Sequence, residues 1–204
     1  MNQKSRLNLK DIINIAIFTV LFIITTFIFA TFLGMSAYTY YYYAGLSAIP
    51  CGIIFVYLRL KVRKFGVLTI LGVLSGAIYV SMGSQWTFLL GYSLAGFLGD
   101  LITKAGDYKK PATLYIGYLV FQLTAFLGNI GMLIFAANDY RKTAISSGMS
   151  ASYIDTVIHQ FTGIMLPVVF IATALGAIIG ALLGLQTMSK HFKKIGMLSH
   201  LASV

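Results

Sequence analysis

The sequence predicts an all-α integral membrane protein, folded as a single membrane domain of six transmembrane helices with both termini in the cytoplasm. Composition is the first observation: hydrophobic residues make up 58% of the 204 residues and charged residues only 10%. So few charges cannot form the polar surface of a soluble domain. The second observation is that the charged residues cluster between apolar segments, most of which approach the ~20 residues that a membrane-spanning helix needs.

The six expected helices cover residues 9–33, 40–58, 65–80, 86–102, 111–135 and 161–185. The first begins like a signal peptide, but its apolar run is longer than the ~7–15 residues of a signal core and lacks a small-residue cleavage site. We therefore expect it to be retained as a helix. In the second helix, Pro50 is expected to kink or break the chain.

The third expected helix is short and rich in glycine, and a basic cluster closes the fourth. Pro111 suits the first turn of the fifth helix, where its missing N–H is no loss. The polar segment 136–160 is predicted to be a long outer loop that could fold as a lid. A basic tail, 186–204, follows the sixth helix.

The lysines and arginines predict the orientation. All except Arg141 and Lys142 fall on one side of the six-helix arrangement, in four separate clusters. Cytoplasmic connections are enriched in Lys and Arg, so this side is predicted to be cytoplasmic. The net charge of +10 is interrupted by long apolar runs, which favours contact with the membrane surface over nucleic-acid binding.

Residues of enzymatic character are scarce. The sequence has no HExxH, GxSxG or phosphate-binding GxxxxGK[ST] motif, so we expect no catalytic residue, metal site or intrinsic cofactor. Apart from Asp11, at the start of the first, Asp100 is the one acid inside an expected span, and an i,i+4 pair with Lys104 is the simplest account of it. An ion-coupled carrier would be expected to place a charge nearer mid-membrane.

Amide and aromatic side chains gather on the predicted outer side, where an aromatic belt at the membrane interface is one interpretation. A small-molecule pocket is the other, because such groups at the ends of several helices are typical of ligand sites. The candidate substrate-binding residues are Tyr38, Tyr41, Gln85, Trp86, Asn129, Asn138, Tyr140 and His159.

The sixth expected helix carries Gly176, Gly180 and Gly184 at four-residue spacing. Small residues at this spacing let two membrane helices approach closely. The stripe therefore indicates either packing within the chain or a docking face for a partner subunit.

The segments LNLKDIINIAIFT, at the start, and SKHFKKIGML, near the end, resemble the MptD-like (Trep_Strep) family. The resemblance implies a substrate-binding S component of an energy-coupling factor (ECF) transporter in the bacterial cytoplasmic membrane. It further implies a transmembrane T subunit and two ATPase subunits as partners, which would carry out ATP hydrolysis. S components often dock through an alanine-xxx-alanine pattern on the first helix. Here Val20 stands four residues after Ala16, so docking would use Ala16 and Thr19 or another face.

The cargo implied by the resemblance includes haem or another organic iron complex, with a vitamin-like heterocycle as the rival. The outer side lacks the carboxylate, His or Cys clusters that a bare divalent metal would need. His159 or a tyrosine is a possible haem ligand. Two functions remain as alternatives to the importer subunit: a stand-alone channel or facilitator for small neutral solutes, and a membrane adaptor without a transport role.

Overall fold

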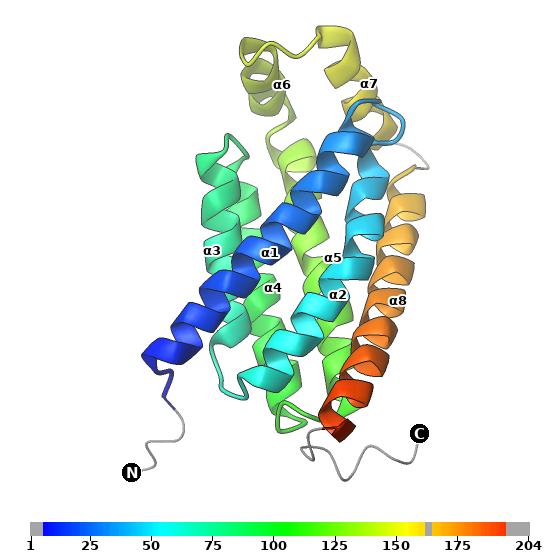
Figure 1. Cartoon of the computed structure of the whole chain (residues 1–204). Coiled ribbons are helices and arrows are strands. Elements are labelled where there is room, and N and C mark those ends of the chain that lie inside the picture. The colour runs from blue at the N-terminus through cyan, green and yellow to red at the C-terminus, as the bar shows by residue number, and fades with distance from the viewer. Residues whose placement is uncertain (1–5, 162–164, 195–204) are drawn as a thin grey trace.

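The computed structural model describes residues 6–161 and 165–194, apart from the side chains of 161 and 189–194, and within them it shows eight α-helices and no strand (Figure 1). The elements are α1 Leu9–Gly34, the 3-10 turn η2 Tyr40–Tyr42, α2 Tyr43–Lys61, α3 Val67–Ser81, α4 Trp86–Lys104, α5 Pro111–Phe135, α6 Ala137–Ser146, α7 Ala151–Phe161 and α8 Met165–Lys194. The described start of α1 and the end of α8 lie at the same end of the bundle (Figure 1). Residues 195–204, most of the predicted basic tail, lie outside the described residues.

Five of these helices are long and apolar enough to cross a membrane, namely α1, α2 with its preceding turn, α4, α5 and α8. The remaining predicted span, the third, corresponds to α3, which has 15 residues. At ~1.5 Å per residue it reaches roughly 22 Å, less than the ~30 Å of a hydrocarbon core. The integral-membrane character of the fold agrees with the sequence prediction, and six spans with cytoplasmic termini remain a prediction.

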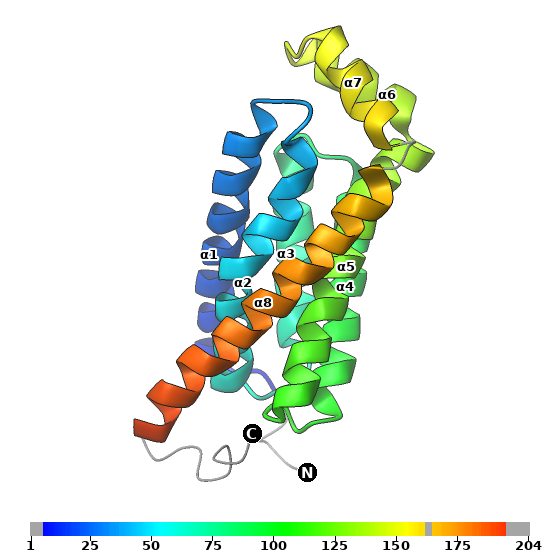
Figure 2. The same ribbon diagram turned by 90° about the vertical axis from the view of Figure 1, so that its right-hand side faces the viewer.

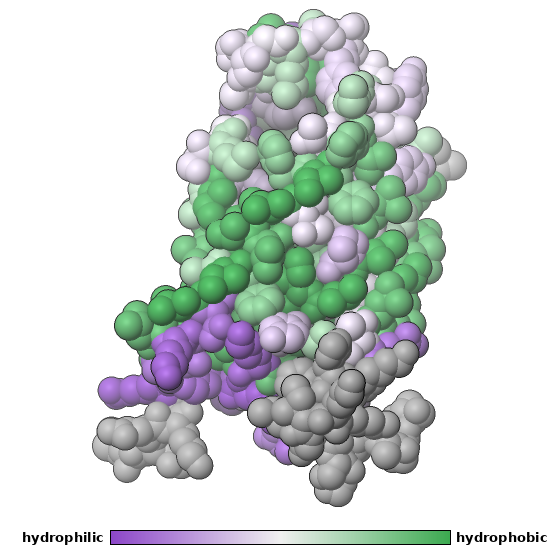
Figure 3. All heavy atoms as spheres, viewed as in Figure 1, coloured by the Kyte–Doolittle hydropathy of each residue, from purple (hydrophilic) through white to green (hydrophobic). Residues whose placement is uncertain are grey.

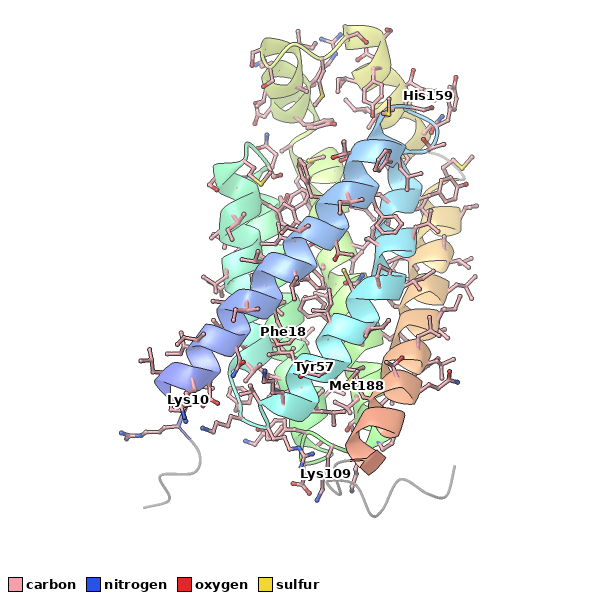
Figure 4. The ribbon with its side chains drawn as sticks, viewed as in Figure 1. Lys10, Phe18, Tyr57, Lys109, His159 and Met188 are labelled. Carbon is pink, nitrogen blue, oxygen red and sulfur yellow. The ribbon has the colours of Figure 1, made fainter. Side chains whose placement is uncertain are left out.

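Surface polarity divides the molecule into layers along the bundle axis. On the face shown in Figure 3, a wide belt of hydrophobic residues crosses the middle, and hydrophilic residues are concentrated at the end where α1 begins. Lys10 and Lys109 lie at this end, which we call the basic end, and His159 lies at the opposite end (Figure 4). An apolar belt between two polar ends is the surface expected of a chain embedded in lipid.

Glycines bring α2 and α8 into direct backbone contact. A Cβ atom on Gly176 would lie 1.9 Å from the carbonyl oxygen of Gly45, and one on Gly180 would lie 2.3 Å from that of Ala48. Gly184 meets the same helix at Gly52. The stripe predicted as a partner-docking face is therefore occupied by packing inside the chain, because only residues without side chains let two membrane helices approach so closely.

At the basic end, lysine side chains connect segments that are distant in the sequence. The Lys64 ammonium lies 2.6 Å from the Asp11 carboxylate and ties the α2–α3 connection to the first turn of α1. Phe18 and Tyr57 face one another in Figure 4, with ring centroids 5.2 Å apart, and the Lys61 ammonium lies 5.6 Å from each ring. Lysines that extend from apolar surface towards water are typical of helix ends at a membrane interface.

Asp100 does not pair with Lys104, so that prediction is wrong. Its carboxylate lies 3.5 Å from the guanidinium of Arg59 in α2, and it accepts hydrogen bonds from the backbone N–H and the hydroxyl of Thr69. Lys104 instead lies over the ring of Phe65, 5.5 Å from its centroid. Spacing along α4 suggested a surface pair, but Asp100 is fully buried and faces its neighbours in α2 and α3.

One further expectation about the backbone needs correction. The segment 136–160, expected to be a loop, forms the helices α6 and α7. At Pro50, where a kink or a break was expected, there is no break, since α2 continues through it from Tyr43 to Lys61. By contrast, Pro111 begins α5 as predicted.

Candidate functional site

A cavity of about 420 Å³ lies at the end of the bundle opposite the basic end. Its walls come from the outer ends of α1 and η2, the α3–α4 turn, the neighbouring parts of α4 and α5, and the helices α6 and α7. The lining residues are Ala30, Thr31, Gly34, Tyr40, Met82, Gly83, Ser84, Gln85, Phe88, Met132, Tyr140, Thr143, Ala144, Ser147, Met149 and Tyr153. A hollow of this size, bounded by several helices, suits a small organic molecule.

The helices α6 and α7 form a cap over this end of the bundle (Figures 1 and 2). The chain can reverse between them because Gly148 has a φ of +91°, which residues with a side chain rarely adopt. Ile154 and Val157 of α7 are fully buried. These apolar anchors explain why a polar segment is ordered as helices rather than as a loop.

Hydrogen bonds hold the cap to the α1–α2 connection. The Tyr153 hydroxyl donates to the carbonyl oxygen of Gly34 at 2.6 Å, and the Tyr41 hydroxyl donates to that of Val157. Across the cap, Arg141 of α6 makes a two-point ion pair with Asp155 of α7, at 2.7 and 3.1 Å. The cap is thus one unit, attached to the bundle by tyrosines at its α7 side.

The cavity wall carries no formal charge among its described lining residues, although it lies near a polar end of the molecule. Burial and the neighbouring Tyr153 raise the pKa of Tyr140 to about 12, and burial raises the pKa of Tyr153. Both phenols therefore stay protonated at neutral pH and offer neutral hydroxyl groups. The charged residues of the cap helices, Asp139, Arg141, Lys142 and Asp155, lie outside the cavity lining, and Arg141 and Asp155 form an ion pair.

A second, much smaller hollow of about 20 Å³ lies inside the bundle, with room for about one water molecule. Most of its lining side chains are polar and uncharged, and the lining residues are Phe22, Thr26, Tyr43, Ala44, Ser47, Tyr92, Gln122, Ala125, Phe126, Asn129 and Thr173. The Asn129 amide donates to the Tyr43 hydroxyl. Polar groups inside a membrane-spanning bundle are costly and usually mark a functional site.

The sequence matches a known protein family. A family model described as "Hypothetical bacterial integral membrane protein (Trep_Strep)" matches residues 9–194. The chain belongs to the Trep_Strep family. No curated protein and no solved structure shows significant similarity to it.

The Trep_Strep match extends from α1 to α8 and therefore includes the cap and both hollows. The family membership predicted from the two terminal segments is confirmed, and with it the character of a bacterial integral membrane protein. An S-component role is a finer statement, which the family description does not contain.

The structure brings three of the predicted site residues of this Trep_Strep protein to the two hollows. Gln85 and Tyr140 line the outer cavity, and Asn129 lines the inner hollow. Tyr41 is buried but acts as an anchor for the cap. The remaining candidates, Tyr38, Trp86, Asn138 and His159, are exposed and lie outside both linings.

Sequence reasoning missed most of the lining. Met149 and Tyr153 belong to the segment expected to be a loop, so no helical face could be assigned to them. Gln122, Ser47 and Thr173 are separated by long stretches of sequence and meet only in the folded bundle. The sequence signal for such lining residues is a polar side chain within a predicted span. Among the residues that line the inner hollow, only Asn129 was predicted in this way.

Within the described part of the chain, no cluster of three or more His, Cys, Asp or Glu side chains could hold a metal ion. The cavity instead offers tyrosine hydroxyls, methionine thioethers and one amide. These groups bind organic molecules through ring contacts and single hydrogen bonds.

Proposed function

We propose that this chain is the substrate-binding subunit of an ECF-type importer. In this role it captures a small organic molecule at the outer face, and a T subunit with two ATPase subunits drives delivery to the cytoplasm. The observation that carries the proposal is the capped cavity of about 420 Å³ at one end of an apolar helical bundle. Binding sites of drug-sized and vitamin-sized molecules have volumes in this range, from about 300 to 1,000 Å³.

The distribution of charge supports an outward-facing cavity. Lys10 and Lys109 lie at the basic end, far along the bundle from the cap (Figure 4), and Lys64 pairs there with Asp11 in the first turn of α1. Because Lys and Arg are enriched in cytoplasmic connections, this distribution supports a basic end in the cytoplasm and a cavity on the outside. A subunit that collects solute for import needs this arrangement.

Partner contact is proposed for the exposed face of α1. Of the predicted docking residues, Ala16 is exposed, whereas Thr19 is buried and its hydroxyl donates to the carbonyl oxygen of Ile15. Ile13, Ile17 and Val20 lie beside Ala16 with about half of their surface exposed. A small residue within an apolar face lets another membrane helix pack closely, so a T subunit would contact α1 here.

The cargo is proposed to be largely apolar and ring-containing, because tyrosines, methionines and Phe88 form much of the wall. Haem or another organic iron complex fits this description, as does a vitamin-like heterocycle. Tyrosine and methionine are both possible axial ligands of haem iron. His159, the ligand suggested by the sequence, is exposed and outside the cavity lining.

The proposal is tested by identifying small molecules that copurify with the protein, using mass spectrometry of denatured samples. Ser147→Trp fills the cavity from its wall, and Ser146→Trp places the same ring on the neighbouring exposed position outside the lining. We expect a molecule bound by the native protein and the S146W variant but lost from S147W. A molecule retained equally by both variants, or none in the native protein, would contradict the proposal.

Two further measurements separate the finer parts of the proposal. Haemin titration should shift the Soret band if haem is the cargo, and an unshifted band at micromolar haemin removes haem. Uptake into proteoliposomes should require the T subunit and the ATPases, and robust uptake by this chain alone would reject the importer-subunit role.

A further inference from the structure

The two hollows lie one above the other, separated by one helical turn. On α1, Thr26 lines the inner hollow and Ala30, four residues nearer the cap, lines the outer cavity. On α4, which runs the opposite way, Tyr92 lines the inner hollow and Phe88 lines the outer cavity. Residues four apart on a helix lie on the same face, one turn from each other.

The α2 and α5 sides show the same relationship. Tyr40 lines the outer cavity and Tyr43 the inner hollow, with ring centroids 5.4 Å apart. On α5, Asn129 lines the inner hollow and Met132 the outer cavity. Four walls therefore continue from one hollow into the other, and we call the outer cavity and the inner hollow the upper and lower levels.

Aromatic side chains form the partition between the levels. The rings of Phe88 and Tyr92 are stacked with centroids 6.4 Å apart, and Tyr79 packs against both at 5.7 and 5.3 Å. Asn129 and Tyr43, which are hydrogen-bonded to each other, both line the lower level. A partition made of side chains can open without displacing a helix.

The lower level offers hydrogen-bonding groups without charge. The hydroxyls of Thr26 and Thr173 donate to the carbonyl oxygens of Phe22 and Val169, each one turn back in its own helix, which leaves their oxygen lone pairs as acceptors. Asn129 and Gln122 add amide groups, which both donate and accept. A ligand with its own donors and acceptors would be satisfied here.

A charged group would not be satisfied. The described lining of both levels contains no Asp, Glu, Lys, Arg or His. The buried pair Arg59 and Asp100 belongs to the basic end and is not part of either lining. A charge moved from water into such an interior loses its hydration without gaining a partner of opposite charge.

We propose that the two levels form one substrate site for an uncharged molecule, whose hydrogen-bonding end enters the lower level while its remainder stays in the upper level. This inference rests on the proposed function in taking the outer cavity as the substrate site. It goes further by assigning an uncharged substrate, which favours the vitamin-like heterocycle over haem, whose two propionates are ionised at neutral pH. It also makes the lower level, rather than the cap, the part that rejects ions.

Cysteine modification tests this inference without transport or partner subunits. The native thiol is first removed by Cys51→Ala, and Ser47→Cys then places a thiol of similar size in the lower level. Ser147→Cys in the same background places a thiol in the upper level as the matched control. The probes are the hydroxyethyl, aminoethyl and sulfonatoethyl methanethiosulfonates, which have similar lengths and are neutral, cationic and anionic at neutral pH.

Each rate for the S47C variant is divided by the rate of the same reagent with the S147C variant, and modification is measured by intact mass. We expect the normalised rate of the neutral reagent to exceed those of both ions by at least about tenfold, because a charge is poorly tolerated in the bundle interior. Equal normalised rates would overturn the inference. So would modification of S147C by all three reagents with none at position 47, since the levels would then be unconnected.

Thr173→Cys provides a second thiol in the lower level, from α8 instead of α2, if the S47C variant does not fold. The proposed function can be refuted independently of this inference. A chain that shows the expected charge selectivity but copurifies no small molecule keeps the neutral two-level site and loses the importer-subunit role.

Discussion

The Arg59 guanidinium of α2 lies 3.5 Å from the Asp100 carboxylate of α4, and neither side chain has any exposed surface. The guanidinium also donates to the carbonyl oxygens of Val62 and Lys64 and lies over the ring of Tyr108. The ion pair thus fixes two helices and two connections at the basic end. Removing one partner of a buried pair is costly because the other charge remains without compensation.

Asp100→Ala should therefore lower the free energy of unfolding by about 3–5 kcal/mol. Thermal unfolding of the purified protein in detergent, followed by circular dichroism, measures the loss. Lys104→Ala is the control, since Lys104 is exposed and lies over the Phe65 ring, and it should change stability little. Equal losses of unfolding free energy in the two variants would support the i,i+4 pair between Asp100 and Lys104 that the sequence suggested.

Gly176→Ala should separate α2 from α8, because its new Cβ would lie 1.9 Å from the carbonyl oxygen of Gly45. Overpacking of this kind costs typically about 1–3 kcal/mol, and backbone atoms cannot move aside as a side-chain tip can. Gly34→Ala is the control, since the nearest atom to its Cβ is 3.6 Å away in the Tyr40 ring. The difference in melting temperature between the two variants is the measurement, and no difference would argue against the α2–α8 interface.

Tyr153→Phe should loosen the cap, because it removes the hydroxyl that donates to the carbonyl oxygen of Gly34. A hydrogen bond of this type contributes about 0.5–1.5 kcal/mol. Faster amide hydrogen exchange in α6 and α7, with unchanged exchange in α5, is the expected result. Tyr38→Phe, at a tyrosine that is 68% exposed, should leave the cap unchanged.

The cap should also become less stable in acid. A hydrogen bond and charge interaction with Arg141 hold the pKa of Asp155 below its ordinary value. A carboxylate with a lowered folded-state pKa stabilises the structure above the unfolded value of ~3.9, and this contribution disappears as the pH falls through the folded-state pKa. Hydrogen exchange in the cap at pH 6 and pH 3, corrected for intrinsic rates, measures the effect.

The Asp155→Asn variant supplies the comparison for that experiment. It lacks the titrating carboxylate, so its cap should exchange faster than the native cap at pH 6 and change less between the two pH values. The same acid response in the variant and the native protein would show that another group is responsible.

Orientation in the membrane is tested by thiol labelling in cells with a membrane-impermeant maleimide. In the C51A background, Lys61→Cys at the basic end should be labelled only after the cells are broken. Ser152→Cys, on the exposed surface of α7, should be labelled in intact cells. Labelling of the K61C variant from outside would reverse the topology and place the cavity in the cytoplasm.

The described spans follow closely from the sequence. The predicted ranges 9–33, 86–102 and 111–135 differ from α1, α4 and α5 by two residues or fewer at each end. These helices are set by local properties: long apolar segments, a basic cluster after the last turn and Pro111 in the first turn of α5.

The cap was not predictable by the same means. Its two helices are short, with 10 residues in α6 and 11 in α7, and segments of that length are marginal as isolated helices. Their order depends on the burial of Ile154 and Val157 and on hydrogen bonds from Tyr41 and Tyr153. Both hydrogen bonds join the segment to residues more than a hundred positions away.

The sequence by itself determined that the chain belongs in a membrane, where most of its helices run and which end carries the positive charge. Those properties follow from composition and the order of residues, because a bilayer sorts apolar and charged groups whatever their partners are. Only the tertiary structure decided that Asp100 pairs with Arg59, that the glycine stripe of α8 faces α2 and that uncharged residues from five helices enclose the lower level. Pairings of this kind depend on how helices distant in the sequence are placed against one another, which spacing along a single helix does not encode.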